Sequence, residues 1–196
     1  MRAEIIKTKE DLRYYIAEDK KRNMGNVSFL KYIAMKLYNT DSYMSFNYLR
    51  ALRKYEYAIN CQKGTLVGNI IYAYRKIIWR RLSVKYGLVL PPNVIGYGFK
   101  MAHVVGGGII VNCKSIGCYC SANAGVIVGN NGSQEKIATI GDHVSLLIGC
   151  KVIGKVTIGD NSIVAPNSVV VKDVPENCIV SGIPAKIIKQ IDPISK

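Results

Sequence analysis

The sequence is poor in acidic residues, in histidine and in long apolar runs. It contains 13 Asp and Glu against 27 Lys and Arg, and two histidines, His103 and His143. Its longest strongly apolar stretch, VVGGGIIV from Val104, is far shorter than the roughly 20 residues of a membrane-spanning helix. We therefore expect no transmembrane helix, and no signal peptide, because charges run through the first ten residues.

The cysteines do not have the spacing of a metal site or a redox site. Six are present, none of them in a C-x-x-C pair, and two histidines are too few to complete a zinc site. Without an export signal, we expect reduced thiols and a cytoplasmic protein that holds no metal. Cys120 and Cys150 fall on repeat positions that carry small side chains, where we expect them to serve packing.

The positive charge is concentrated in the first part of the chain. Residues 1–87 contain 18 Lys and Arg against 7 Asp and Glu, whereas residues 88–196 contain 9 against 6. Every arginine and 11 of the 13 tyrosines lie in the first part. We predict a basic, aromatic-rich helical region over 1–87 and a differently built domain over 88–196.

Three helices are predicted in the basic region. The first follows Thr8 as its N-cap, with acids in its first turn; the others span roughly 45–58 and 66–86. The stretch YAYRKIIWRR from Tyr72 has a basic face beside an aromatic face, which favours packing on a partner subunit. The alternative is attraction to an anionic membrane surface or a lipid-linked acidic substrate, which would place the protein at the inner face of the membrane. Nucleic acid is not an expected partner, because no recognition motif accompanies the charge.

A six-residue repeat runs through the second region. Branched apolar residues recur without a break at Ile140, Leu146, Val152, Ile158, Val164 and Val170. Each is followed four positions later by a small or branched residue, namely Val144, Cys150, Val156, Ser162, Ser168 and Val174. The same register extends backward to Val128, Ala122, Ile116 and Ile110, and Ile95 and Met101 are offset from it by three.

A period of six fits neither a helix nor a simple strand, and it indicates a solenoid. We interpret each hexad as one short parallel strand plus a corner, so that three hexads form a triangular coil of 18 residues. The apolar residue then points inward and the small residue follows at a tight corner, with coils about 4.8 Å apart. The polar stretch at about 130–139 is expected to protrude as a loop.

The hexads, the stretch MAHVVGGGIIVN from Met101 and the ending SGIPAKIIK resemble the hexapeptide-repeat acyltransferases. The closest resemblance is to the serine O-acetyltransferase branch and its relatives in capsule and lipopolysaccharide clusters. The resemblance implies a left-handed parallel β-helix with a short C-terminal cap helix. It also implies a homotrimer that binds acetyl-CoA in the groove between neighbouring prisms.

The resemblance assigns roles to particular residues. His103 would be the general base, because a neutral imidazole can take the proton of an acceptor hydroxyl and then protonate the departing thiolate. The implied cofactor-binding residues are Ile148, Gly149, Ala165, Ala185, Lys186 and Lys189. The implied acceptor-binding residues are Tyr97 and Glu135. His143, in the hexad IGDHVS, is expected to be a corner residue.

Two departures from the serine enzymes concern the acceptor. Ala102 stands where they have an acid beside the catalytic histidine, and the loop NNGSQEKIATIG lacks their second histidine. We therefore expect a sugar hydroxyl of a surface polysaccharide or its precursor as acceptor, with serine as the alternative and a non-catalytic binding protein as a further one. Glu135 or Asp142 of a neighbouring chain is a candidate for orienting His103.

Overall fold

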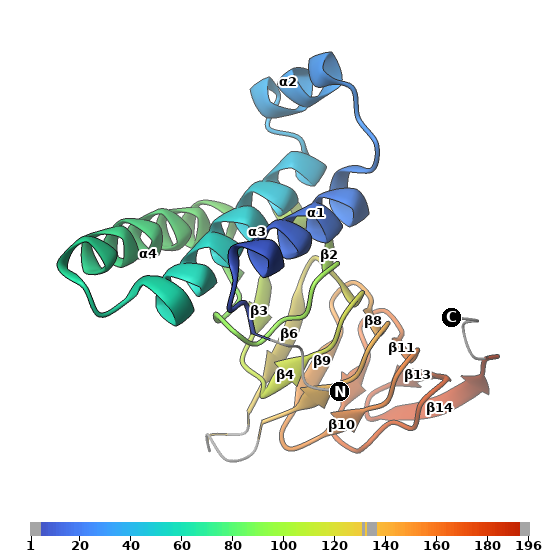
Figure 1. Cartoon of the computed structure of the whole chain (residues 1–196). Helices are drawn as coiled ribbons and strands as arrows, with labels where there is room; N and C mark the ends of the chain where they lie inside the picture. Colours follow the sequence, from blue (N-terminus) through green and yellow to red (C-terminus); the bar gives the residue numbers. More distant parts are fainter. Residues whose placement is uncertain (1–4, 131, 133–136, 193–196) are drawn as a thin grey trace.

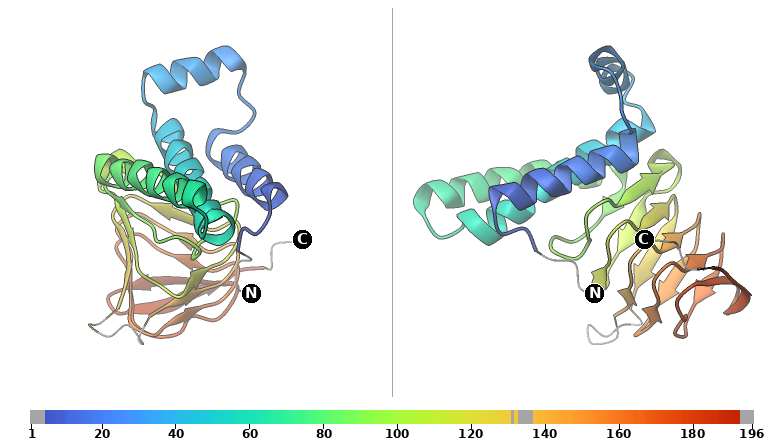
Figure 2. Two further views of the ribbon diagram at one scale, coloured as in Figure 1. Left: turned by 60° about the vertical axis from the view of Figure 1, so that its left-hand side comes forward. Right: turned by 45° about the vertical axis from the view of Figure 1, so that its right-hand side comes forward.

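The computed structural model describes residues 5–130, 132 and 137–192. Four α-helices sit on one end of a three-sided prism of short strands, as Figures 1 and 2 show. The helices are α1 (Lys9–Met24), α2 (Phe29–Leu37), α3 (Asp41–Tyr57) and α4 (Leu66–Tyr86), with a π-helical turn, η1 (Ala58–Gln62), between the last two. The chain changes from helix to strand at Gly87, which ends α4 in the left-handed conformation.

The predicted N-cap of the first helix is confirmed, whereas the second predicted helix, roughly 45–58, begins earlier than predicted, at Asp41 of α3. Thr8 accepts a hydrogen bond from the backbone N–H of Asp11, and the Asp11 carboxylate accepts one from the backbone N–H of Thr8 in return. The third predicted helix, 66–86, has the bounds of α4. The short helix α2 was not predicted; Ser28 caps its start.

The prism is a parallel β-helix, as predicted. Its strands are β1 (Leu88–Val89), β2 (Lys100–Ala102), β3 (Ile109–Val111), β4 (Ser115–Ile116), β5 (Ser121–Asn123), β6 (Val126–Gly129), β7 (Thr139–Ile140), β8 (Ser145–Leu146), β9 (Lys151–Ile153), β10 (Thr157–Ile158), β11 (Ile163–Val164), β12 (Val169–Val170), β13 (Cys178–Gly182) and β14 (Ala185–Gln190). They form three sheets, ordered β1-β3-β6-β9-β12, β10-β7-β4 and β14-β13-β11-β8-β5-β2. Every described pair is parallel except β13 with β14.

Both repeat positions of each hexad point into the core. The six apolar residues from Ile140 to Val170 are buried, and so are the small residues that follow each by four positions. Small side chains are thus selected by the narrow interior near a corner as well as by the tightness of the turn. The two serines among them keep their hydroxyls bonded inside: Ser162 Oγ, for example, donates to the carbonyl of Pro175 at 2.7 Å.

The predicted register is wrong at Ile110, which is 45% exposed, whereas Val111 is buried. Val111 pairs with Val128, 17 residues later, so this coil step is one residue short. Ile95 and Met101 are buried as expected, and each pairs with a residue 21 positions later, Ile116 and Ala122. The three-residue offset in the sequence is therefore a real insertion in the first coil.

The predicted C-terminal helix is wrong. Ala185–Gln190 forms the strand β14, which runs antiparallel to β13 after a turn at Gly182–Pro184. An open row of backbone groups along β13 would be exposed at the end of the prism, and β14 pairs with that edge.

The helices cover the opposite edge of the prism through side chains. Two residues of α1 bind the backbone at β2. Asp19 accepts a hydrogen bond from the N–H of Phe99, just before the strand, at 3.1 Å, and Asn23 accepts one from the N–H of Met101 at 3.0 Å. Ser45 donates to the carbonyl of Met101 at 3.3 Å. Apolar residues of α3 and of the first coil also share one core, so the helices and the prism pack as a unit. No described helix is both long and apolar enough to cross a membrane.

Candidate active site

His103 lies on an enlarged corner of the first coil. Ile109 follows Met101 by eight positions, whereas their strand partners, Ala122 and Val126, are four positions apart. The enlarged corner contains a 3₁₀ turn, Val104–Gly106, followed by two glycines. The insertion lifts His103 to the surface, where its side chain is exposed and its backbone is left-handed, with φ of 59°.

An acid from the helical region fastens this turn. Asp41 is the first residue of α3, and its carboxylate accepts from the backbone N–H of His103 at 2.8 Å and from that of Val104 at 2.7 Å. Two charge-assisted hydrogen bonds to adjacent backbone groups fix the direction in which the His103 side chain leaves the turn. Asp41 thus positions the turn through its backbone. Sequence reasoning missed it, because no local motif links residues 62 positions apart.

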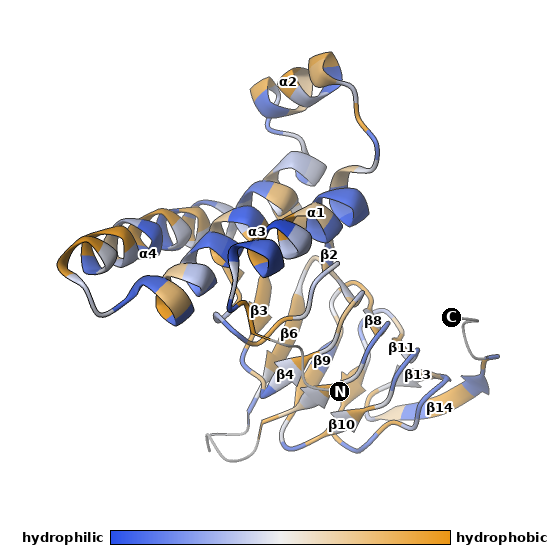
Figure 3. Ribbon diagram, viewed as in Figure 1, coloured by the Kyte–Doolittle hydropathy of each residue, from blue (hydrophilic) through white to orange (hydrophobic). Residues whose placement is uncertain are grey.

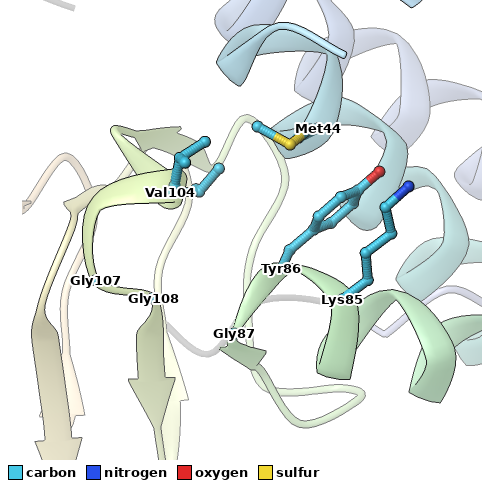
Figure 4. Close-up of a pocket in the computed structure, with 8 residues that line it drawn as sticks. Met44, Lys85, Tyr86, Gly87, Val104, Gly107 and Gly108 are labelled. Carbon is cyan, nitrogen blue, oxygen red and sulfur yellow. The ribbon is translucent and has the colours of Figure 1, made fainter.

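A pocket of about 320 Å³ opens beside the turn (Figure 4). It lies between the start of α3, the end of α4 and the glycine-rich turn, and it is lined by Met44, Lys85, Tyr86, Gly87, Val104, Val105, Gly107 and Gly108. Gly108, with φ of 64°, passes so close to Gly87 that a Cβ at this position would clash with the Gly87 carbonyl. None of the lining residues was predicted; the glycines around it were the only sequence signal.

Several of the predicted cofactor residues share a corner of the prism with His103. This corner joins the six-stranded sheet to the five-stranded sheet; it holds Ile148 and Gly149 between β8 and β9, and Ala165 between β11 and β12. Hydrogen bonds run along it from coil to coil, including Gly125 N–H to the Gly108 carbonyl at 2.8 Å. At about 4.8 Å per coil, Gly149 lies about 10 Å and Ala165 about 14 Å along the prism from the His103 turn.

The predicted residues near the C-terminus lie on the hairpin at the far end of the prism. Ala185 pairs with Gly182, and Lys186 pairs with Ser181, close to the same corner; Lys189 lies farther along β14. Both lysines are exposed.

Tyr97 precedes strand β2 and His103 follows it, so the two residues lie at opposite ends of this strand. It packs edge-to-face against Tyr14, Tyr15 and Tyr119, with ring centroids 5.0 to 5.3 Å apart. Burial raises the pKa of its hydroxyl, with a contribution from Cys118. The structure therefore does not bring Tyr97 and His103 together within one chain. Glu135, the other predicted acceptor residue, lies outside the described residues.

His143 and Asp142 belong to a different corner. His143 is a corner residue, as expected; its backbone is left-handed, with φ of 57°, and its ring stacks on Tyr119 with centroids 5.3 Å apart. The carboxylate of Asp142 accepts from the backbone N–H of Cys118 at 2.7 Å, which ties two coils together. Among the residues that the structure describes, no group of three His, Cys, Asp or Glu is placed to hold a metal ion.

Residues 137–172 match the family model of the bacterial transferase hexapeptide, which describes six repeats. This segment is similar to the hexapeptide repeats of bacterial transferases. Within the hexapeptide segment lie Ile148, Gly149 and Ala165, whereas His103 precedes it.

The chain is also similar to serine acetyltransferases. It is 35% identical over 116 residues to the serine acetyltransferase of Synechococcus elongatus, covering 55% of this chain and 47% of that protein. The chain thus spans about half the length of this curated relative.

Solved serine acetyltransferases share the fold. The Neisseria gonorrhoeae enzyme superposes with a TM-score of 0.67 at 22% identity, covering 94% of this chain and 67% of that one. The Brucella abortus enzyme in complex with coenzyme A gives 0.59 at 23% identity, covering 92% and 67%. These neighbours confirm the predicted left-handed parallel β-helix.

Proposed function

We propose that this chain is an acetyl-CoA-dependent O-acetyltransferase in which His103 is the general base. The observation that carries the proposal is the corner that the His103 turn shares with Gly149 and Ala165. The names of the similar proteins, and the coenzyme A complex of one of them, support the same chemistry.

The corner has the right shape for a long, thin cofactor. Gly125 and Gly149 have no side chains and Ala165 has only a methyl group, and all three residues are partly exposed along the corner, with the side chain of Asn167 lying against Gly149. Ile148 is 46% exposed and offers an apolar contact beside them. Lys186, near the end of the corner, would bind the cofactor phosphates. Pro166 has no N–H to donate, so the backbone contact to the cofactor that the resemblance implies at this position would be absent or displaced.

His103 would act on a bound acceptor in two steps. The neutral imidazole takes the proton from the acceptor hydroxyl while the oxygen attacks the thioester carbonyl. The imidazolium then returns the proton to the sulfur as the carbon–sulfur bond breaks, which leaves an acetyl ester and a free thiol. Holding the hydroxyl and the thioester together supplies much of the acceleration.

L-Serine is the first acceptor to test, because the similar proteins carry that activity in their names. A sugar hydroxyl remains the second candidate, since Ala102 replaces the acid and the loop after Asn130 lacks the second histidine. The pocket beside the His103 turn, with Lys85 and Tyr86 on its wall, is the place where we expect the acceptor to enter.

A second copy of the chain would complete the cofactor groove. Val89 and Ile110, paired on adjacent strands, are each 45% exposed on the outer face of the five-stranded sheet. Such an apolar outer face supports packing against a neighbouring prism in a homotrimer.

The test compares His103→Asn with wild type for thiol release from acetyl-CoA, with L-serine and with a panel of sugars. Asparagine is chosen because it adopts the left-handed conformation readily; Asn161, Asn167 and Asn177 do so at other corners of this chain. We expect kcat to fall by about 100- to 10,000-fold. The matched control, His143→Asn, makes the same change at a left-handed corner away from the site and should keep near-wild-type turnover.

Either of two results would overturn the proposal. One is a chain that binds no coenzyme A by calorimetry. The other is acetyl transfer that persists at wild-type rate in His103→Asn.

A further inference from the structure

A second pocket, remote from His103, lies among the helices. It measures about 490 Å³ and is enclosed by α1, the end of α3, η1 and the first half of α4. Its wall carries four cations from three helices: Lys9, Arg13, Lys54 and Arg75. We call it the basic pocket.

The cations of the basic pocket lack carboxylate partners within the described part of the chain. No Asp or Glu lines it, and both ion pairs found among the described residues belong to Arg53. Asp11, close by on α1, uses its carboxylate on the backbone N–H groups of Lys7 and Thr8. Partial burial, and then the charge of Arg75, lower the pKa of Lys54. An anion in the pocket would relieve this repulsion.

The rest of the lining is largely apolar. Leu12, Tyr57 and Ile71 are half-buried on its floor, and Tyr74 stands at the rim with Arg75 over its ring, 5.5 Å from the centroid. Figure 3 shows the contrast between the hydrophilic helix α1 and the more apolar α4 that faces it across α3. The volume is that of sites for small organic molecules.

We propose that the basic pocket binds a small organic polyphosphate. The phosphates would lie against the four cations, where the arginine forks can each hold two oxygens, and the organic part would rest on the apolar floor. A smaller hollow of about 120 Å³ continues the pocket between α3 and α4; it shares Lys54 and Arg75 and adds Arg50. A ligand with several phosphates could extend into it.

The basic pocket is distinct from the proposed active site. Helix α3 carries Asp41, which holds the His103 turn, at its first residue and Lys54 thirteen residues later. At 1.5 Å per residue, about 20 Å of helix separates them. The inference therefore does not depend on acetyl transfer.

The test uses ATP as probe and Trp79 as reporter. Trp79 is the one tryptophan of the sequence, lies one helical turn after Arg75 and stacks on Tyr55 with centroids 5.1 Å apart. We expect saturable quenching or a spectral shift with ATP, a weaker response to inorganic tripolyphosphate and none with adenosine.

The double variant Lys54→Gln/Arg75→Gln should raise the Kd for ATP at least tenfold. Its matched control, Lys63→Gln/Lys76→Gln, removes the same charge from two lysines that flank the ring of Tyr72 outside the pocket. The control should change the Kd less than threefold, and circular dichroism should show that both variants are folded.

Four outcomes would overturn the proposal. The first is no ATP binding in low salt. The second is an equal loss of ATP affinity in both double variants, which means that ATP is attracted unspecifically by the net positive charge. The third is ATP binding that is weakened by Lys186→Gln but not by Lys54→Gln/Arg75→Gln, which places ATP at the corner proposed for the cofactor. The fourth is binding to phosphatidylglycerol vesicles through the pocket cations without any binding of ATP, which makes the region a membrane surface.

Discussion

The carboxylate of Asp41 accepts a hydrogen bond from the backbone N–H of His103 at 2.8 Å and a second one from that of Val104 at 2.7 Å. The first turn of α3 thereby holds the enlarged corner of a coil that begins after the helices end. Ala102, directly before His103, provides no acid, and the acid that touches this turn comes from 62 residues earlier. The helical region is thus part of the candidate site as well as a cover for the prism.

Replacing Asp41 should therefore impair acetyl transfer more than folding. In Asp41→Ala the turn loses both hydrogen bonds, and a shift of about 1 Å in the His103 side chain would lower kcat on the order of 100-fold. The kcat of Asp41→Asn, which keeps one acceptor oxygen, should lie between those of the wild type and Asp41→Ala. The measurement is kcat and KM for thiol release, together with the melting temperature.

The control for Asp41 is Asp173→Ala. Asp173 makes the same kind of bond, from its carboxylate to the backbone N–H of Thr157 at 2.7 Å, but on a later coil. If both variants lose activity equally, Asp41 has no particular effect on His103.

Arg53 should be the residue most costly to remove at the junction of helices and prism. It is fully buried and donates to Asp19 at 2.8 Å, to Glu56 at 3.1 Å and to the carbonyls of Ile95 and Gly96 at 2.7 and 2.6 Å. Arg53→Met would leave two buried carboxylates unpaired and lower the free energy of unfolding by about 3–5 kcal/mol. Arg50→Met, one turn earlier with one hydrogen bond to Asn47, should cost less than about 1 kcal/mol.

The loss in Arg53→Met should depend on pH. Burial already raises the pKa of Asp19 and of Glu56 above the ordinary values of 3.8 and 4.5, and removing the cation raises both further. The folded variant then binds more protons than the unfolded chain, so its stability falls as pH rises above about 4. Urea unfolding at pH 5 and pH 8 measures this; a deficit that is larger at pH 5 would contradict it.

The thiols should divide into reactive and protected classes. Cys61 is exposed, whereas burial raises the pKa of Cys113, Cys120 and Cys150 to about 12 and keeps them protonated at neutral pH. At pH 8 a thiol reagent should label Cys61 first and these three only after unfolding. Cys61→Ser should remove the fast phase; its persistence would show that a core thiol is accessible.

Gly149 should resist substitution more than a positive-φ glycine that has room for a methyl group. Its φ is 70°, and an added Cβ would clash with the side chain of Asn167 on the next coil. Gly87, with φ of 66° in the left-handed region, would place an added Cβ in ordinary contact with the Cα of Gly108 at 3.6 Å. Gly87→Ala should cost about 1 kcal/mol for its conformation alone, and Gly149→Ala distinctly more, in urea unfolding. Equal costs would mean that Asn167 moves aside freely.

The sequence by itself determined the prism and much of the helical part. Each coil of a solenoid contacts only its neighbours, so the hexads between Ile140 and Val170 were sufficient to predict parallel strands, buried positions and tight corners. Thr8 at the start of α1 and the left-handed Gly87 after α4 mark helix ends, because capping also depends only on residues that are close in the sequence.

Tertiary structure decided everything that joins distant parts of the chain. The hydrogen bonds from the His103 turn to Asp41, the ion cluster of Arg53 and the basic pocket each bring together groups separated by dozens of residues, which no local period encodes. The C-terminal segment illustrates the same limit. The residues Ala185–Gln190 fit a helix or a strand equally well by composition, and the unpaired edge of β13 selected the strand.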